Sequence, residues 1–368
     1  MRSQPIFDSR EAAPLYVAAN DCAASQGLRV QALPQIGAAA WDAFVQQERS
    51  ATFFHLSGWK RVMARTYGYD THYLAAVGGG RIEGVLPLVH VRSRLFGNAL
   101  ISNAFCVYGG IAASNPAAVQ TLAEAAAALG ERLAADYVEL RSAEAAVPGW
   151  AVKDGTYATF RRPLSARDDD NLKAIPRKKR ADVRKAIKAD LPVDVSGDLD
   201  AFYRIYAESV RNLGTPVFGK RYLEAVKAEF GDQCEIAVVH GPEGPAAALT
   251  SFYFRDQVLP YYGGGSSAAR QLHAYDYLYW TLMQRAAAKG VRLFDFGRSK
   301  RGTGAFDYKT YWGFEPTPLA YQYHLVRSRS VPDVNPLNPK YRLMVAAWQK
   351  LPLRAANLLG PFLSRQLG

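Results

Sequence analysis

The segment Pro260-Tyr261-Tyr262-Gly263-Gly264 decides the fold, because its last three residues also stand in the first half of the chain as Tyr108-Gly109-Gly110. The two copies lie roughly 155 residues apart. Around both, the sequence predicts the same order of elements: a β-hairpin, a third strand, Tyr-Gly-Gly, a helix, and a strand that ends in Arg-Ser. A repeat of this length indicates two domains of one architecture.

The predicted elements of the two halves are apolar runs bounded by glycine-rich turns and followed by one helical pattern each. Hairpin strands pair antiparallel, whereas a strand-helix-strand crossover forces a parallel pair. We therefore expect an α/β fold with two mixed sheets, flanking helices and a cleft between the halves. The strands are expected at 71–77, 81–91, 99–102 and 138–142, then at 234–240, 246–255, 257–261 and 294–299, and the helices at 116–135 and 273–289.

Length and composition agree with two globular domains. The chain has 368 residues, 49% of them hydrophobic and 21% charged, which excludes disordered, collagen-like and low-complexity proteins. The formal net charge is +12. This charge favours an anionic partner, such as nucleic acid, a phosphorylated substrate or an acidic membrane face, without choosing among them.

The three cysteines, Cys22, Cys106 and Cys234, are too far apart for a metal or redox motif and suit a reducing compartment. The first twenty residues lack the apolar core of a signal peptide, and no apolar run reaches the roughly 20 residues of a spanning helix. We expect a cytoplasmic protein, soluble or peripheral at the inner face of the membrane, with no metal and no tightly bound cofactor.

The segment 171–190 is strongly basic, with eight cations and one internal acid, Asp182. Pro176 is predicted at the first position of a helix, and the acidic run Asp168-Asp169-Asp170 before it is interpreted as an interdomain linker. Two more helices are expected at 199–211 and 220–230. The helix either binds an RNA or other anion or presents a solvated face over the domain junction. The candidate ligands for the anion are Arg177, Lys178, Lys179, Arg180 and Arg184.

After Ser328 the chain changes character. Residues 341–367 have helical character, several cations and no acid, but Pro352 and Pro361 are expected to interrupt the helix. The tail either packs back on the core or binds anionic membrane weakly and reversibly. The domains are therefore predicted at 1–165 and 166–328, with a basic tail at 329–368.

Most familiar catalytic motifs are absent. The sequence has no phosphate-binding Gly-x-x-x-x-Gly-Lys loop, no Gly-x-Ser-x-Gly elbow and no His-Glu-x-x-His, which disfavours serine hydrolases and metalloenzymes. The densest polar stretch is 294–304, Phe-Asp-Phe-Gly-Arg-Ser-Lys-Arg-Gly-Thr-Gly. Because successive side chains of a strand point to opposite faces, Asp295 is expected on the face opposite Phe294 and Phe296. The loop after it, with Arg298, Ser299 and Lys300, suits a phosphate, although a solvated basic turn has the same composition.

Five segments carry a family resemblance, at 107–110, 175–185, 212–218, 260–264 and 294–314. Together they resemble the FemAB-type aminoacyltransferases, and more closely the FemAB-like proteins associated with the exosortase and PEP-CTERM system of exopolysaccharide-producing bacteria. The resemblance spans about residues 51–323. It implies tandem GNAT-like (acyl-CoA N-acyltransferase-like) domains, in agreement with the repeat.

This resemblance implies transfer of an aminoacyl group from aminoacyl-tRNA to an amine on a nucleotide-sugar or lipid-linked saccharide precursor of peptidoglycan or exopolysaccharide. The family's catalytic segment matches Tyr308, Lys309 and Gly313. Attack of an amine on an ester builds negative charge on the carbonyl oxygen, which a lysine ammonium stabilises. A structural role for Lys309 is the alternative.

Two departures from known patterns leave other functions open. The pyrophosphate loop of acyl-CoA-dependent GNAT enzymes is missing after the strand that ends at Gly263-Gly264, and only one basic helix replaces the helical arm of some Fem proteins. The alternatives are an N-acyltransferase with an acyl-CoA or acyl-carrier-protein donor, and a binding protein without chemistry.

Further substrate-binding residues are expected in the cleft. Tyr262 is predicted to be the exposed member of its tyrosine pair, beside a glycine turn that lets a substrate approach. Tyr108 and Asp295 are also expected to bind substrate, because they lie in two of the segments that resemble the FemAB family, 107–110 and 294–314. Arg211 and His273 are weaker candidates, with surface ion pairing and core packing as their alternatives.

Overall fold

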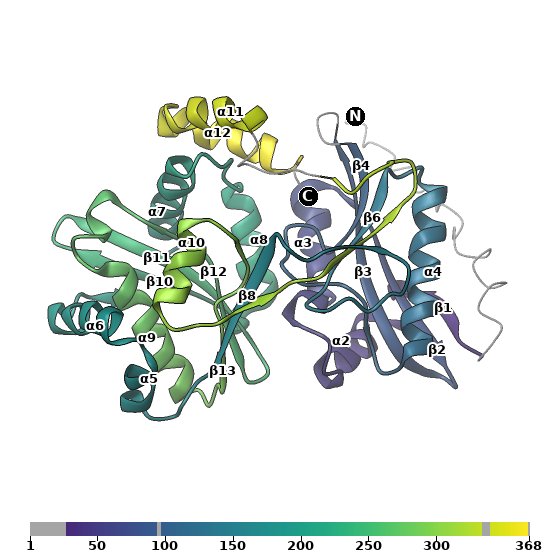
Figure 1. Ribbon diagram of the computed structural model, residues 1–368, viewed down its shortest axis with the longest axis horizontal. Coiled ribbons are helices and arrows are strands. Elements are labelled where there is room, and N and C mark those ends of the chain that lie inside the picture. Colours follow the sequence, from purple (N-terminus) through teal and green to yellow (C-terminus); the bar gives the residue numbers. More distant parts are fainter. Residues whose placement is uncertain (1–26, 94–96, 333–338, 367–368) are drawn as a thin grey trace, which may run out of the picture.

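The computed structural model describes residues 27–93, 97–332 and 339–366, so Cys22 and the N-terminal segment considered above lie outside the described residues. Each half of the chain forms an eight-stranded mixed sheet with helices on both faces (Figure 1). This confirms the predicted fold class. None of the helices in the described ranges is long and apolar enough to cross a membrane.

The first sheet has the strand order β1-β2-β3-β4-β6-β16-β7, and the short β5 pairs with β3. Helix α4 (Pro116–Arg132) packs its apolar side on one face, while α2 (Ala38–Gln47) and α3 (Gly58–Tyr67) cover the other (Figure 1). The strands are β1 (Arg29–Ala32), β2 (Asp70–Gly78), β3 (Arg81–Ser93), β4 (Gly97–Ser102), β5 (Ala112–Ala113), β6 (Tyr137–Arg141), β7 (Ala151–Lys153) and β16 (Tyr321–Leu325).

The second sheet has the order β14-β8-β13-β12-β11-β10-β9, and β15 pairs with β8. Helices α6 (Arg177–Ala189) and α9 (Ala274–Ala288) lie together on one face, and α7 (Leu199–Asn212) and α8 (Lys220–Phe230) pack on the other. The strands are β8 (Tyr157–Pro163), β9 (Val193–Asp194), β10 (Cys234–Gly241), β11 (Gly244–Phe254), β12 (Gln257–Gly265), β13 (Leu293–Asp295), β14 (Ser299–Lys300) and β15 (Pro316–Pro318).

The predicted internal repeat is confirmed by the strand pairing. In the first sheet β2, β3 and β4 are antiparallel and β4 pairs parallel with β6 across α4. In the second sheet β10, β11 and β12 are antiparallel and β12 pairs parallel with β13 across α9. Each Tyr-Gly-Gly therefore lies between the third antiparallel strand and the crossover helix, or at the end of that strand.

The two halves exchange strands. β8 precedes the basic segment in the sequence but lies in the second sheet, against β13, whereas β16 follows the second half and lies in the first sheet, between β6 and β7. The chain thus passes between the halves at least twice (Figure 1). The domain boundaries at 165 and 328 stay a prediction, and the sheets do not follow them.

Two local predictions were wrong. The acidic run is not a linker, because Asp168–Ala174 forms helix α5 with all three aspartates in its first turn, where negative charge stabilises the N-terminus. Pro361 does not interrupt the tail, since it lies inside helix α12 (Leu353–Ser364). Pro352 is the N-cap that separates α12 from α11 (Pro339–Gln349).

The tail packs on α7. The backbone carbonyl of Gln349 accepts from Arg211 at 3.0 Å, and the side-chain amide of Gln349 donates to the carbonyl of Asn212 at 3.0 Å. Tyr69 of the first half donates its hydroxyl to the carbonyl of Arg365. The tail is therefore an ordered arm that touches both halves.

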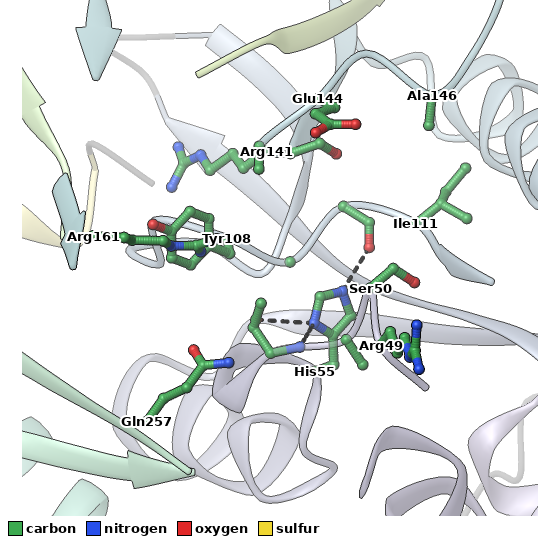
Figure 2. Close-up of a pocket in the computed structure, with 16 residues that line it drawn as sticks. Arg49, Ser50, His55, Tyr108, Ile111, Arg141, Glu144, Ala146, Arg161 and Gln257 are labelled. Atoms are coloured by element: carbon green, nitrogen blue, oxygen red, sulfur yellow. Dashed lines mark hydrogen bonds between the residues drawn. The ribbon is translucent and has the colours of Figure 1, made fainter. Parts of the chain in front are cut away.

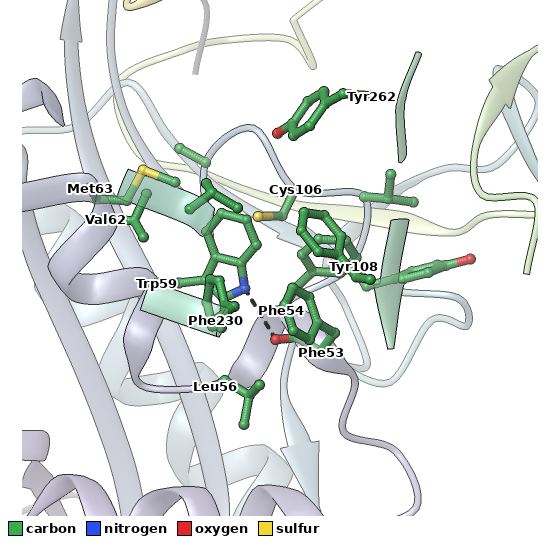
Figure 3. Packing of buried hydrophobic residues seen from close by; sticks show 14 of the residues in the cluster. Phe53, Phe54, Leu56, Trp59, Val62, Met63, Cys106, Tyr108, Phe230 and Tyr262 are labelled. Carbon is green, nitrogen blue, oxygen red and sulfur yellow. Dashed lines mark hydrogen bonds between the residues drawn. The ribbon is translucent and has the colours of Figure 1, made fainter. Parts of the chain in front are cut away.

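An aromatic core joins the two halves (Figure 3). The short 3-10 helix η2 (Phe53–His55) inserts Phe53 into the second half, where its ring stacks on Phe252 at a centroid distance of 4.5 Å and lies 4.6 Å from Phe230. Trp59 lies 5.0 Å from Phe230 and donates its indole N–H to the carbonyl of Phe53 at 3.1 Å. One buried cluster therefore contains residues of both halves, and we expect the halves to unfold as one cooperative unit.

We predict that Phe53→Ala lowers the free energy of unfolding by about 3–5 kcal/mol, because it leaves a cavity in a fully buried aromatic cluster. Urea denaturation followed by tryptophan fluorescence and circular dichroism measures this. Val152→Ala, at a position 47% exposed, is the matched control and is expected to change little. Two separate transitions in the wild type would show that the core does not couple the halves.

Candidate functional site

The junction between the two sheets is built around the carboxylate of Asp295, which is 0% exposed at the end of β13. Arg161 Nε of β8 donates to it at 2.7 Å, the backbone N–H of Gly297 at 2.8 Å, and the hydroxyl of Tyr108, from the first half, at 3.1 Å. A buried carboxylate is stable only with such partners. The predicted site residues Asp295 and Tyr108 are therefore in direct contact.

The charges of this cluster are fixed by burial and pairing. Burial, and then the neighbouring Asp295 charge, raise the pKa of Tyr108 well above its usual range, so its hydroxyl stays protonated and donates. Burial works against the charge of Arg161, but Asp295 and Tyr108 outweigh it and hold the pKa of Arg161 above its usual value. The guanidinium also lies 4.8 Å from the centroid of the Tyr108 ring.

We predict that Asp295→Asn costs about 1–3 kcal/mol of unfolding free energy, because it removes the buried charge that pairs with Arg161, whose own side chain is 34% exposed. Chemical denaturation measures the effect. Asp182→Asn is the control, since that carboxylate is partly exposed and forms only a 3.9 Å pair with Lys185. A loss below about 1 kcal/mol at Asp295 would contradict its structural importance.

The structure explains why both residues after Tyr108 are glycines. Gly109 has φ +138°, which L side chains rarely adopt, and a Cβ on Gly110 would lie 1.9 Å from Ser142 Oγ. The two glycines therefore let the loop after β4 lie directly against the end of β6, with Tyr108 directed at Asp295.

The second Tyr-Gly-Gly differs from prediction. Gly264 and Gly265 belong to β12, and Cβ atoms there would lie 2.7 Å from the carbonyl oxygen of Ile205 and 2.4 Å from the ring of Tyr275. The glycines admit α7 and a tyrosine ring, so the expectation that they form a turn open to substrate was wrong.

The expected exposure of Tyr262 was also wrong. Tyr262 is 6% exposed, its hydroxyl lies 2.8 Å from that of Tyr222, and Tyr261 is the half-buried member of the pair. The reason is a β-bulge: Thr250 pairs with Tyr262 and Ser251 with Pro260, which leaves Tyr261 unpaired. The bulge breaks the alternation on which the prediction depended. Substrate binding by Tyr262 stays a prediction.

Lys309 lies on the short helix α10 (Gly304–Tyr311), and its Nζ donates to the carbonyls of Gly297 at 3.0 Å and Arg298 at 3.1 Å. Burial lowers the pKa of Lys309 to about 7; Asp295 acts against this shift and Arg298 adds to it. Gly297 thus connects the two groups, since its N–H faces Asp295 and its carbonyl faces Lys309. This lysine can hold or release a proton near neutral pH.

The loop residues next to Lys309 are held by β8 of the second sheet and β16 of the first sheet. Arg298 donates to the hydroxyl of Tyr321 at 3.0 Å and lies 4.5 Å from the centroid of the Tyr157 ring. Ser299 is buried and Lys300 half-buried in β14, paired with β8. The predicted phosphate loop is therefore not a solvated turn, but its role in binding stays a prediction.

Tyr308 points away from Lys309, toward α9. Burial and the nearby Asp276 charge raise the pKa of Tyr308 well above its usual 10, and its hydroxyl donates to Asp276 at 2.7 Å. Lys179 of α6 pairs with the same carboxylate at 2.5 Å, and His273 Nδ1 lies 3.7 Å from it. Three predicted site residues, Tyr308, Lys179 and His273, therefore meet at the buried carboxylate of Asp276.

The other predicted cations divide into two groups. Arg180 donates to the carbonyls of Ile175 and Lys173, so it closes the turn before α6, and Arg211 binds the tail as described above. Arg177, Lys178 and Arg184 are exposed along α6. Only these three of the five proposed anion ligands are available to a large anionic partner.

A cavity of about 430 Å³ lies beside the Asp295 cluster, on the first-half side (Figure 2). Its polar lining includes Ser50, Thr52 and Ser142 from the first half, and Arg161 and Gln257 from the second. Sequence reasoning missed most of this site, and the one available signal was the repeated Arg-Ser at 141–142. The missed charged and polar residues are Arg49, Ser50, Thr52, His55, Arg141, Ser142, Glu144, Arg161 and Gln257.

Two of these residues are fixed by the protein itself. His55 accepts from the N–H of Thr52 through Nδ1 and therefore donates from Nε2 to the carbonyl of Gly110, at 2.8 Å. Burial lowers the pKa of His55 to about 4, so the ring is neutral near pH 7. Arg141 donates to Glu139 at 2.7 Å. Both shape the cavity wall, and His55 has no lone pair left for use as a base.

Comparison with known proteins agrees with the fold described above. A family model described as an acetyltransferase (GNAT) domain matches residues 177–310. The crystal structure of FemX superposes with a TM-score of 0.66 at 15% identity and covers 86% of this chain and 100% of FemX. No curated protein matches the sequence.

Two further structures share the fold at 12% identity and a TM-score of 0.50. The match with L-PGS from Bacillus licheniformis covers 86% of this chain and 97% of the L-PGS chain. The match with the C-terminal domain of a candidate lysylphosphatidylglycerol synthetase from Agrobacterium fabrum covers 78% of this chain and 91% of that domain's chain. Residues 177–310 therefore match a GNAT domain model, and the chain as a whole shares a tandem GNAT-like fold with FemX.

Proposed function

We propose that the protein is a FemAB-like transferase that forms an amide by moving an aminoacyl group to an amine on a cell-envelope or exopolysaccharide precursor. The observation that carries this proposal is the half-buried Lys309, held on two backbone carbonyls next to the Asp295 cluster. The FemX fold over the whole length of FemX supports it. An association with an exosortase and PEP-CTERM system belongs to the same proposal.

In the proposed reaction the acceptor amine attacks the ester carbonyl of aminoacyl-tRNA. A C–N bond forms, the ester C–O bond breaks, and the proton lost by the amine passes to the leaving ribose hydroxyl. Negative charge develops on the carbonyl oxygen, and the Lys309 ammonium stabilises it in a site where little water screens the interaction. Tyr308 holds α10 on α9 through Asp276 and so fixes the position of its neighbour Lys309.

The cavity next to Asp295 is the proposed acceptor site. Its hydroxyl and amide groups suit a saccharide or peptide, and its volume lies in the range of small-molecule sites. Arg49 and Glu144 stand exposed at its edge and offer one charge of each sign. A nucleotide-sugar or lipid-linked saccharide that carries an amine would fit this chemistry, in the cytoplasm or at the inner face of a membrane.

An acyl-CoA or acyl-carrier-protein donor is the second candidate, and the acetyltransferase domain match favours it. Against it stands the start of α9, where an acyl-CoA pyrophosphate would approach the helix N-terminus. Here the first turn carries the buried Asp276 carboxylate, already paired with Lys179. A carboxylate in this place opposes a pyrophosphate.

The donor is tested with purified protein, charged tRNA and precursor-containing cell extract. Transfer of a labelled amino acid that RNase abolishes supports the proposal. Transfer that survives RNase and needs a thioester supports the second candidate. Precursor binding without transfer from either donor would make the protein a binding protein.

Lys309→Ala is predicted to lower the transfer rate roughly 10²- to 10³-fold with the fold retained, because one group that stabilises the oxyanion is lost. Single-turnover kinetics and circular dichroism measure this. Lys289→Ala, at a half-exposed lysine paired with Glu235, is the control and is expected to keep full activity. A fully active Lys309→Ala protein would remove the proposed role.

The pH dependence provides a separate test, since the ammonium form of Lys309 is lost as the pH rises through about 7. Arginine keeps its charge in this range. We therefore predict that the rate ratio of wild type to Lys309→Arg falls as the pH rises from about 6 to about 8. Taking the ratio cancels titration of the acceptor amine. A rising ratio would mean that Lys309 acts as a base.

The basic helix is proposed to bind the tRNA backbone. Replacing Arg177, Lys178 and Arg184 by Gln is expected to flatten the slope of log affinity against log salt by about two units, since each phosphate contact releases counterion. Filter binding over a salt series measures the slope. The control replaces three exposed arginines of the first half, Arg29, Arg81 and Arg132. Equal slopes for both triple variants would contradict the proposal.

A further inference from the structure

Helix α12 presents three large apolar side chains, Leu358, Leu359 and Phe362, to solvent and buries small ones against the protein. Ala356, Gly360 and Ser364 are buried, at successive four-residue steps along one side of the helix. Leu358 is 79% exposed and Phe362 59%, and these two residues are also four apart on another side. This distribution is the reverse of the one that a helix stabilised only by packing on its own protein would have.

The orientation of the tail is fixed by close packing. A Cβ on Gly360 of α12 would lie 2.8 Å from the side chain of Val217. A Cβ on Gly214 would lie 2.4 Å from the side chain of Val345 of α11. The hydrogen bonds of Gln349 at the end of α7 hold α11 in addition. The outward side chains therefore have no room to turn inward by rotation of either helix.

The apolar exposure is concentrated in this arm. Nine large hydrophobic side chains are strongly exposed in the described part of the chain, and six of them lie in the tail or directly beside it. The tail forms one end of the molecule, above α7 (Figure 1). An apolar patch of this kind marks an interaction surface. We name it the tail patch; it consists of Leu213, Leu343, Met344, Leu358, Leu359 and Phe362.

The charged residues of the tail after Asp333 are all cations. Lys350, Arg354 and Arg365 are exposed on or next to the same helices. The sequence contains no Asp or Glu after Asp333. A surface that combines exposed Leu and Phe with cations, and carries no nearby acid on its own segment, is complementary to an anionic lipid bilayer.

We propose that the tail patch is a docking surface for an anionic lipid bilayer, into which Leu358, Phe362 and their neighbours insert while Lys350 and Arg354 meet lipid phosphates. The inference goes beyond the proposed function, because the patch lies on the helical arm and its binding does not depend on the chemistry at Lys309. It also assigns a role to a segment that the transfer reaction does not use.

The test is flotation of the full-length protein with vesicles of phosphatidylcholine alone or mixed with phosphatidylglycerol. Wild type is expected to float with the anionic vesicles. Leu358→Gln/Phe362→Gln is expected to bind at least 10-fold more weakly, since burial of one such side chain changes a binding constant by roughly 10- to 100-fold. Lys350→Gln/Arg354→Gln is expected to lose roughly 30-fold on anionic vesicles only.

The matched control is Val152→Gln/Val195→Gln, which replaces two exposed apolar residues outside the tail patch and is expected to bind as wild type does. All substituted side chains are solvent-exposed, and thermal melting verifies that each variant is folded. Wild type that stays unbound, or equal binding by the wild type and the Leu358/Phe362 variant, would overturn the proposal. A dimer in sedimentation velocity that this variant dissociates, without vesicle binding, would identify a second copy as the occupant instead.

Discussion

The dehydrated carboxylate of Asp295 is the constraint on which the arrangement of the two halves depends. A charge that is 0% exposed needs a cation and hydrogen-bond donors, and here they come from three parts of the chain: Arg161 on β8, Tyr108 after β4, and the Gly297 N–H. β8 must lie against β13 to supply Arg161, and the first half must lie close enough to supply Tyr108. Both the exchange of β8 into the second sheet and the close approach of the two sheets therefore supply partners to the buried Asp295 carboxylate.

The position of Lys309 follows from this junction. Gly297 gives its N–H to Asp295 and its carbonyl to Lys309, so the loop that the carboxylate orders also provides the lysine's acceptors. The aromatic core around Phe53 excludes water from the neighbouring junction and couples the halves. A lysine in such surroundings loses solvation of its ammonium, which is why its pKa falls to about 7.

The parts of the fold that depend on local pattern could be predicted from the sequence. The repeat, its hairpins, its two crossover helices and the parallel crossovers were confirmed, because hydrophobic periodicity and turn residues determine them within short windows. The single strand predicted at 294–299 was wrong, since β13 ends at Asp295 and β14 begins at Ser299. The exchange of β8 and β16 could not be predicted, since either strand has the composition to pair with either sheet. The exposure of Tyr262 was wrong because a single bulge changes the face of every residue after it. Lys179 was predicted to bind an external anion, because its partner Asp276 lies almost a hundred residues away in the sequence and no local pattern connects the two. The cavity residues Arg49 and Gln257 belong to no motif, so only the folded chain brings them together.

The most direct test of this account is the titration of Lys309 Nζ, followed by NMR of protein labelled with ¹³C and ¹⁵N in lysine and assigned with the Lys309→Arg variant. The account predicts a midpoint at about 7 in the wild type. It also predicts a lower midpoint in a folded Asp295→Asn variant, because the Asp295 charge favours the ammonium. A midpoint near the ordinary lysine value of about 10.4 in both proteins would contradict the account, because Lys309 would then be a solvated side chain that Asp295 does not influence.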